Sequence, residues 1–164
     1  MRKAFTLVEL MVAVTIVMIV SGGGFIYISR FGARQKMEGS QKVIANNLRL
    51  ARNFALTNQT KGGDDLRYVE VEIESDGTMR ALANGDGALA YFEEDVTEDE
   101  ISLTKSPSGS VFFSAYEGKL LKAEGGLLVP VAIGETVRVV INSSVAVGES
   151  RAVEILPSGL INEK

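Results

Sequence analysis

Residues 5–13 read Phe-Thr-Leu-Val-Glu-Leu-Met-Val-Ala, and the chain stays apolar from there to Ile28. Arg2 and Lys3 precede this run, and Glu9 is its only charged side chain. As an α-helix, residues 5–28 would measure about 36 Å, which is enough to cross a hydrocarbon core of about 30 Å. A charged side chain at the bilayer centre costs about 2.5–3.5 kcal/mol on insertion scales, so such residues are functional candidates. The sequence therefore predicts a membrane-spanning helix with a functional carboxylate near its start.

This N-terminal pattern resembles that of type IV prepilins and of the pseudopilins of type II secretion. The resemblance rests on Ala4-Phe5-Thr6-Leu7-Val8-Glu9, placed between a short basic leader and an apolar helix. It implies that a prepilin peptidase cuts between Ala4 and Phe5, that the new N-terminus at Phe5 is methylated, and that Glu9 serves subunit pairing. The family usually has Gly before the cut, whereas this chain has the similarly small Ala4. The alternative is an uncleaved signal anchor whose Glu9 lies near the interface by chance.

The hydrophobic pattern divides the chain into four parts. We expect a cleaved leader at 1–4, a transmembrane or filament-core helix at 5–28, an amphipathic helix at 29–61 and a β-rich globular head at 62–164.

The amphipathic part is recognised by its spacing. Ile44, Leu48, Ala51 and Ala55 follow intervals of four, three and four, which is typical of one buried helix face. Gly62-Gly63 predicts the end of this helix, because glycine is common just beyond a helix terminus. The triplet Gly22-Gly23-Gly24 is the place where a bend is most expected, since each glycine costs about 1 kcal/mol relative to alanine in a helix interior.

Beyond Leu66 the hydrophobic period changes to two. Val69, Val71 and Ile73 alternate with glutamates, which indicates a half-buried strand. Turn signals at 75–78 and 84–87 predict hairpins on either side of a strand at 79–83. Further strands are expected at 88–92, 101–104, 110–116, 119–123, 127–133, 136–142 and 151–156. The predicted fold is therefore α+β, with a long N-terminal helix, transmembrane and then amphipathic, packed on an antiparallel β head.

Within the prepilin-like proteins, the chain is most similar to the H-type minor pseudopilins and the FimT-like minor pilins. Their helices carry an Ala-Arg step before an all-β head, as Ala51-Arg52 does here, and they often end near a turn like Pro157-Ser158-Gly159. This likeness concerns the architecture of the head rather than a specific motif.

The composition excludes several kinds of chemistry. Cys, His and Trp are absent, so this chain has no thiolate zinc site, no disulfide and no histidine general base of its own. We expect no catalytic residues, no metal and no cofactor. Residues 30–67 hold eight cations and three anions, whereas residues 68–164 hold seven cations and seventeen anions. A basic stalk therefore joins an acidic head, and its cations can meet head anions, lipid phosphates, acidic neighbours or nucleic acid.

The most acidic segment of the head is residues 93–100, with six carboxylates in Glu-Glu-Asp-Val-Thr-Glu-Asp-Glu. The charge density predicts a solvated surface loop. A calcium site is the alternative, because Ca²⁺ prefers oxygen ligands and some pseudopilins hold calcium in the head.

The resemblance implies a structural subunit of a type IV pilus or a type II secretion pseudopilus rather than an enzyme. It implies insertion in the bacterial inner membrane by a single pass, with the head outside the cytoplasm, and then assembly into a periplasmic or cell-surface filament. The implied partners are other pilin or pseudopilin subunits, the prepilin peptidase and methyltransferase, the inner-membrane assembly platform and membrane lipid. The alternative function is a DNA-binding minor pilin of a DNA-uptake pilus.

Overall fold

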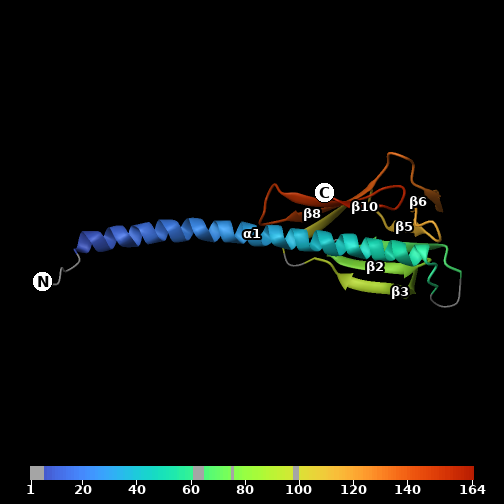
Figure 1. Cartoon of the computed structure of the whole chain (residues 1–164), viewed down its shortest axis with the longest axis horizontal. Helices are drawn as coiled ribbons and strands as arrows, with labels where there is room; N and C mark the ends of the chain where they lie inside the picture. The colour runs from blue at the N-terminus through green and yellow to red at the C-terminus, as the bar shows by residue number, and fades with distance from the viewer. Residues whose placement is uncertain (1–5, 61–64, 75, 98–99) are drawn as a thin grey trace.

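A computed structural model of the chain describes residues 6–60, 65–74, 76–97 and 100–164, and for residues 23–27 it describes the backbone alone. One helix dominates it: α1 runs from Leu7 to Leu56, and its first half projects away from the head (Figure 1). The helix passes through Gly22-Gly23-Gly24 without a break, so the bend expected there is absent. It ends at Leu56, earlier than the glycine pair predicted, and Asn58 already has a positive φ of 47°. Gly62-Gly63 lie outside the described residues.

The two halves of α1 differ in what covers them. Large apolar side chains from Leu7 to Val20 remain 47–74% exposed. In the second half one face is buried against the strands, as the spacing predicted, at Ala33, Met37, Ile44, Leu48, Ala51 and Ala55. Within the described part of the chain, no helical stretch has both the length and the hydropathy needed to cross a membrane.

The head consists of two antiparallel sheets, where the sequence had predicted one antiparallel β head without this division. The six-stranded sheet has the order β3-β2-β1-β5-β6-β7 and the four-stranded sheet has the order β10-β9-β8-β4. Their bounds are β1 Tyr68–Ile73, β2 Thr78–Ala83, β3 Asp86–Asp95, β4 Ile101–Ser106, β5 Val111–Ser114, β6 Leu120–Glu124, β7 Leu127–Pro130, β8 Val137–Ser143, β9 Ser150–Ile155 and β10 Ile161–Glu163.

The alternating pattern of β1 is confirmed. Val69 and Val71 are fully buried, and Glu70 and Glu72, which alternate with them, lie on the opposite face. The β2–β3 hairpin turns at Asn84 and Gly85, both with positive φ, as the turn signal predicted. Strand β3 extends to Asp95, so the first three acids of the run 93–100 pair with β2. The prediction of a loop is wrong for these three residues.

The second half of α1 packs across both sheets and closes the core. It contacts β1 and β5 of the six-stranded sheet and β8, β9 and β10 of the four-stranded sheet. The buried Gln41 ties the C-terminal strand to the helix, because its Nε2 donates to the carbonyl oxygens of Ala152 at 2.8 Å and Lys164 at 3.0 Å. Near the end of α1, Arg52 ties the β5–β6 turn to the helix, since its Nε donates to the carbonyl of Gly118 at 3.2 Å. The head is therefore fixed to α1 between Ala33 and Leu56.

Candidate functional site

The predicted site residue Glu9 lies in the first turn of α1. Its Oε2 accepts hydrogen bonds from the backbone N–H and the hydroxyl of Thr6, both at 2.9 Å. The backbone N–H of Glu9 donates in return to the Thr6 hydroxyl oxygen at 3.3 Å. This reciprocal pair is a capping box, which satisfies backbone donors that the start of a helix leaves unpaired. The carboxylate is thereby held at the N-terminal end of the helix.

Thr6 is a site residue that the sequence prediction missed. The signal was present, because Thr6-Leu7-Val8-Glu9 fits the spacing of a capping box before an apolar run. The other predicted site residues, Ala4 and Phe5, lie outside the described residues. The structure therefore places Glu9 beside Thr6 and leaves the predicted cleavage site undescribed.

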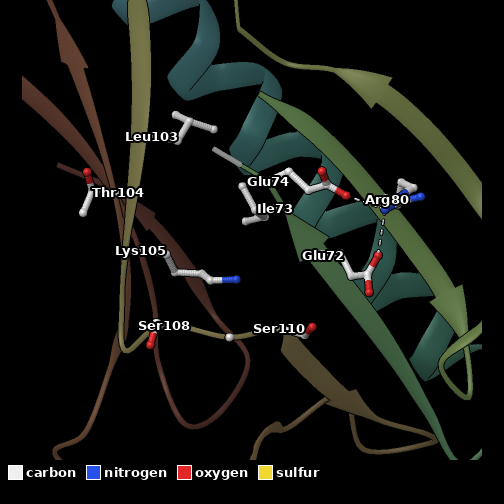
Figure 2. A pocket seen from close by; sticks show the side chains of 10 residues that line it. Glu72, Ile73, Glu74, Arg80, Leu103, Thr104, Lys105, Ser108 and Ser110 are labelled. Atoms are coloured by element: carbon white, nitrogen blue, oxygen red, sulfur yellow. Dashed lines mark hydrogen bonds and ion pairs between the residues drawn. The ribbon is translucent and has the colours of Figure 1, made fainter. Parts of the chain in front are cut away.

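A cleft of about 470 Å³ separates the two sheets of the head and is lined on one side by β4 and on the other by β1 and β2. Figure 2 shows Lys105 reaching from β4 across this cleft toward Glu72 of β1. Arg80 of β2 pairs with Glu72 at 3.3 Å and also with Glu74, so it draws both carboxylates to its own side. Burial lowers the pKa of Lys105, and the charges of Glu72 and Glu70 offset only part of that effect.

The cleft offers little for catalysis. Its two carboxylates, Glu72 and Glu74, share Arg80. Lys105 is half-buried on the inner face of the edge strand β4, where it pairs in register with Val139 of β8. An inward-pointing charge on an edge strand is a common device against unwanted strand pairing. Lys105 has this position, and we assign it that structural role.

The acidic run has a different arrangement from the predicted solvated loop. Glu94 lies on β3, and its Oε2 accepts a hydrogen bond at 2.8 Å from Nδ2 of Asn47, a buried residue of α1. Asp95 Oδ1 accepts from the backbone N–H of Thr97 at 3.1 Å. Residues 98 and 99 lie outside the described part, and within the described residues no group of three acidic side chains is placed to hold a metal ion.

Comparison with known proteins bears on both the N-terminus and the fold. A family profile described as the prokaryotic N-terminal methylation motif matches residues 1–25. The crystal structure of the type IV minor pilin FimU of Pseudomonas aeruginosa in space group P21 is similar, with a TM-score of 0.58 and 16% identity, over 82% of this chain and 92% of that chain. The same minor pilin in space group P65 gives a TM-score of 0.55 at 16% identity, over 77% and 91%. Among curated proteins, none matches significantly.

The chain therefore has the fold of a type IV pilin and carries a prokaryotic N-terminal methylation motif. At 16% identity the solved structures establish the fold, and the family profile establishes the N-terminal motif independently of them. The predicted architecture, a long N-terminal helix packed on antiparallel strands, is confirmed.

Four of the stalk cations pair with acids of the same chain. Lys42 pairs with Glu38 at 2.8 Å, one turn away on α1. The other pairs join the helix to the head: Arg34 with Glu149, Lys36 with Glu100 at 4.0 Å and Arg49 with Glu163 at 2.9 Å. These pairs are exposed, so solvent screens them and each adds little to stability. Their main consequence is electrostatic, because part of the stalk's positive charge is neutralised within the chain.

Proposed function

We propose that this protein is a minor pilin or pseudopilin, a structural subunit of a type IV pilus or a type II secretion pseudopilus. Residues 5–28 anchor it in the bacterial inner membrane until it is extracted into the filament. One observation carries the proposal: the N-terminal methylation motif opens a helix whose first half projects from a pilin-type head with its apolar side chains uncovered. Such a surface requires an apolar environment, and lipid and a bundle of neighbouring helices are the two that this role provides.

Processing is the first step of the proposed role. A prepilin peptidase cuts between Ala4 and Phe5, and the amine of Phe5 is methylated. Intact-mass measurement of the protein from membrane fractions tests this step, and the expected mass is that of residues 5–164 plus a methyl group. Ala4→Gly should be cut at least as well as the wild type. A protein that keeps residues 1–4 in cells with an active prepilin peptidase would exclude this processing.

Assembly is the second step, and Glu9 provides its specificity. After cleavage the cationic amine of Phe5 and the carboxylate of Glu9 both lie in or near lipid, where unpaired charges are costly. Within one chain Glu9 already bonds to Thr6 through Oε2, and no described residue donates to Oε1. In staggered neighbours, the Glu9 carboxylate of one subunit can meet the Phe5 amine of the next. This contact would also set the axial register, because any other height leaves both charges unpaired.

The test compares Glu9→Val, Glu9→Asp and Thr15→Val in membrane fractions and in sheared filaments. Glu9→Val should be inserted and cut normally but should be strongly depleted from filaments. Glu9→Asp should be intermediate, because it keeps the charge with a shorter reach. Thr15→Val is the matched control: it removes a polar group of the same helix whose hydroxyl bonds only to the carbonyl of Met11 among described residues. Normal incorporation of Glu9→Val would refute the pairing role.

The position of the subunit within the filament follows from the same contact. A subunit confined to the tip has no neighbour above it and no use for the Glu9 carboxylate. We therefore place this subunit below at least one other.

DNA binding in an uptake pilus is the second candidate, and its basis is the basic stalk. The internal ion pairs of Arg34, Lys36, Lys42 and Arg49 reduce the positive charge available to phosphates. We therefore favour the structural role. Equal transformation frequencies in the deletion strain and the wild type, together with a loss of piliation or secretion, would support this choice.

A further inference from the structure

Positive charge gathers where the projecting half of α1 meets the head. Arg30 and Arg34 follow the apolar run and lie one helical turn apart, so they share a face of α1. At the same place the head contributes Arg151 from the start of β9 and the acid Glu149 from its β8–β9 loop, residues 144–149. Both nitrogens of one edge of the Arg34 guanidinium donate to Glu149, with Nε at 3.0 Å from Oε1 and 2.7 Å from Oε2.

A third arginine lies close to the same carboxylate. Arg151 is the second residue of β9 and is exposed. The hydrogen bond from Arg34 lowers the pKa of Glu149, and the charges of Arg34, Arg151 and Arg30 act in the same direction. Strand β9 packs against α1, and Arg151 also lowers the pKa of Glu38 on that helix, after the larger effect of Lys42. Arg34 therefore binds Glu149 directly, and the charges of Arg151 and Arg30 act on the same carboxylate. With Glu38 and its partner Lys42 included, four cations stand against two carboxylates, a surplus of two positive charges.

The height of this cluster matches the headgroup layer of a bilayer. If Glu9 lies at the cytoplasmic boundary, the nineteen helical steps to Ile28 measure about 28 Å, close to the 30 Å of a hydrocarbon core. Arg30 and Arg34 then lie about 3 Å and 9 Å beyond the outer boundary. The headgroup regions add about 5–8 Å on each side. The two arginines therefore bracket the layer that contains the lipid phosphates.

Exposed apolar side chains accompany the arginines. Val147, in the same β8–β9 loop as Glu149, is 85% exposed, and Phe31 of α1 is 53% exposed. Basic groups beside apolar groups are the combination by which proteins lie on anionic membrane surfaces. Guanidinium groups also suit phosphate in particular, because their planar fork donates two parallel hydrogen bonds.

We propose that Arg30, Arg34 and Arg151 form a binding patch for anionic phospholipid headgroups at the junction of stalk and head. This inference rests on the proposed membrane-anchored role. Glu149 is the counter-ion that the chain itself supplies: it holds Arg34 when no lipid phosphate is present, as in a subunit that has left the membrane. The patch fixes the depth and orientation of the head above the bilayer, and lipid composition then affects how readily the subunit is extracted.

The experiment uses the full chain, whose lack of native cysteine allows one probe to be attached at Val147→Cys. The labelled protein is reconstituted into phosphatidylcholine vesicles and into vesicles with 30% phosphatidylglycerol. Flotation measures membrane anchoring, and the probe's fluorescence reports the docking of the loop. Added inorganic phosphate distinguishes a site for free phosphate from a site for lipid. Arg34→Gln, Arg151→Gln and Glu149→Gln are compared with Arg138→Gln, an exposed arginine at the opposite end of β8 from the loop.

We expect flotation with both kinds of vesicle. The fluorescence should change only with the vesicles that contain phosphatidylglycerol, and free phosphate should not reproduce that change. Each basic residue near an anionic surface contributes about 1 kcal/mol, which is about fivefold in binding. Arg34→Gln and Arg151→Gln should therefore each weaken the lipid dependence about fivefold, and Arg138→Gln should leave it unchanged. Glu149→Gln should strengthen it, which a merely structural role of Glu149 would not do.

Two results would overturn the inference in different ways. The first is normal flotation combined with any of three fluorescence results: no change with phosphatidylglycerol, a change that free phosphate reproduces, or equal changes in Arg138→Gln and Arg34→Gln. Each of these would refute the patch and leave the proposed function standing. Failure to float with phosphatidylcholine vesicles would remove the membrane anchor, and the patch would fall with it.

Discussion

Gly159 is the position where the structure allows a substitution to be judged most directly. It lies in the turn Pro157-Ser158-Gly159 that seats the C-terminal strand against α1, and its φ is +78°. A Cβ at this position would lie far inside contact distance of the carbonyl oxygen of Gly118 and 2.7 Å from Nε of Arg52. The hydrogen bond between these two groups fixes the β5–β6 turn to the helix, and Nη2 of Arg52 also donates to the carbonyl of Ser158 in the Pro157-Ser158-Gly159 turn at 3.4 Å. Gly159→Ala therefore disturbs the docking of the head as well as the local backbone.

The chain contains a matched control for the backbone part of this effect. Gly126, in the β6–β7 turn, has a nearly equal φ of +83°, and a Cβ there would meet nothing within 4 Å. Positive φ costs a non-glycine residue about 1–2 kcal/mol, so both alanine variants should lose that much stability. The overlap with the Gly118 carbonyl should add about 1–3 kcal/mol for Gly159→Ala, the usual cost of forcing atoms into a packed site.

Thermal unfolding of the full chain in mild detergent, followed by circular dichroism, measures this difference. For a chain of this size, 1 kcal/mol corresponds to about 2–4 °C in Tm. Gly126→Ala should melt about 2–8 °C below the wild type, and Gly159→Ala should melt a further 2–12 °C lower on the same scale. Equal melting temperatures for the two variants would refute the claim that the turn is sterically locked to α1.

Two further stability predictions concern charged groups of the head. Glu94→Ala should destabilise the chain by about 1–3 kcal/mol, because the buried Asn47 amide loses its acceptor. The control Glu93→Ala, on the same strand, should change the free energy of unfolding by no more than about 0.5 kcal/mol. Urea titration measures both variants, and equal effects would contradict the role of the amide. The second concerns Lys105, whose pKa in the folded chain is lowered below the ordinary value of 10.5 by burial. Between the folded and the unfolded pKa the unfolded chain binds more protons, so stability rises with pH across that alkaline window. Lys105→Met should therefore be more stable than the wild type at neutral pH, and its advantage should shrink toward pH 10.5; an advantage that is the same at both pH values would show that the charge is not the cause.

The sequence predicted the elements of this fold better than their assembly. The N-terminal helix and the alternation of Val69 and Val71 are local patterns, and local patterns determine local structure. The division into two sheets is not local. Strands β4 and β5 follow each other along the chain, yet β4 pairs with β8 and β5 pairs with β1. The general tendency of consecutive strands to pair gave no sign of that separation.

The acidic run and Lys105 show how tertiary context changes the meaning of a charge. Glu93, Glu94 and Asp95 belong to the edge strand β3, where charged side chains are tolerated and protect the edge. Their number led to the prediction of a loop, although the strand had already begun at Asp86. Lys105 occupies the third inward position after Ile101 and Leu103, so the alternation of β4 already placed it on the buried face.

The candidate site could be predicted in part for a physical reason. Glu9 stands out because a charge in an apolar run is costly wherever the run is buried. Its partner Thr6 is less conspicuous, since threonine is ordinary at a helix start, and only the spacing to Glu9 marks it. The arginine patch could not be found from the sequence alone, because Arg151 is distant from Arg34 in the chain and the fold of β9 brings it to the stalk.

The energetics of the exposed helix half support the assembly role that we propose for Glu9. Eleven large apolar side chains between Leu7 and Val20 are exposed in the isolated chain, and burying each is worth about 1.5–3 kcal/mol. That gain is obtained in a bilayer as well as in a helix bundle, because lipid tails are as apolar as leucine. Moving the helix from lipid into a filament therefore changes the hydrophobic term little. What remains is packing between helices and the fate of Glu9, which lipid leaves costly and a correctly staggered neighbour can neutralise. In the proposed assembly the carboxylate thus adds little to the gross burial energy of the helix, yet it would distinguish the assembled state from the membrane state.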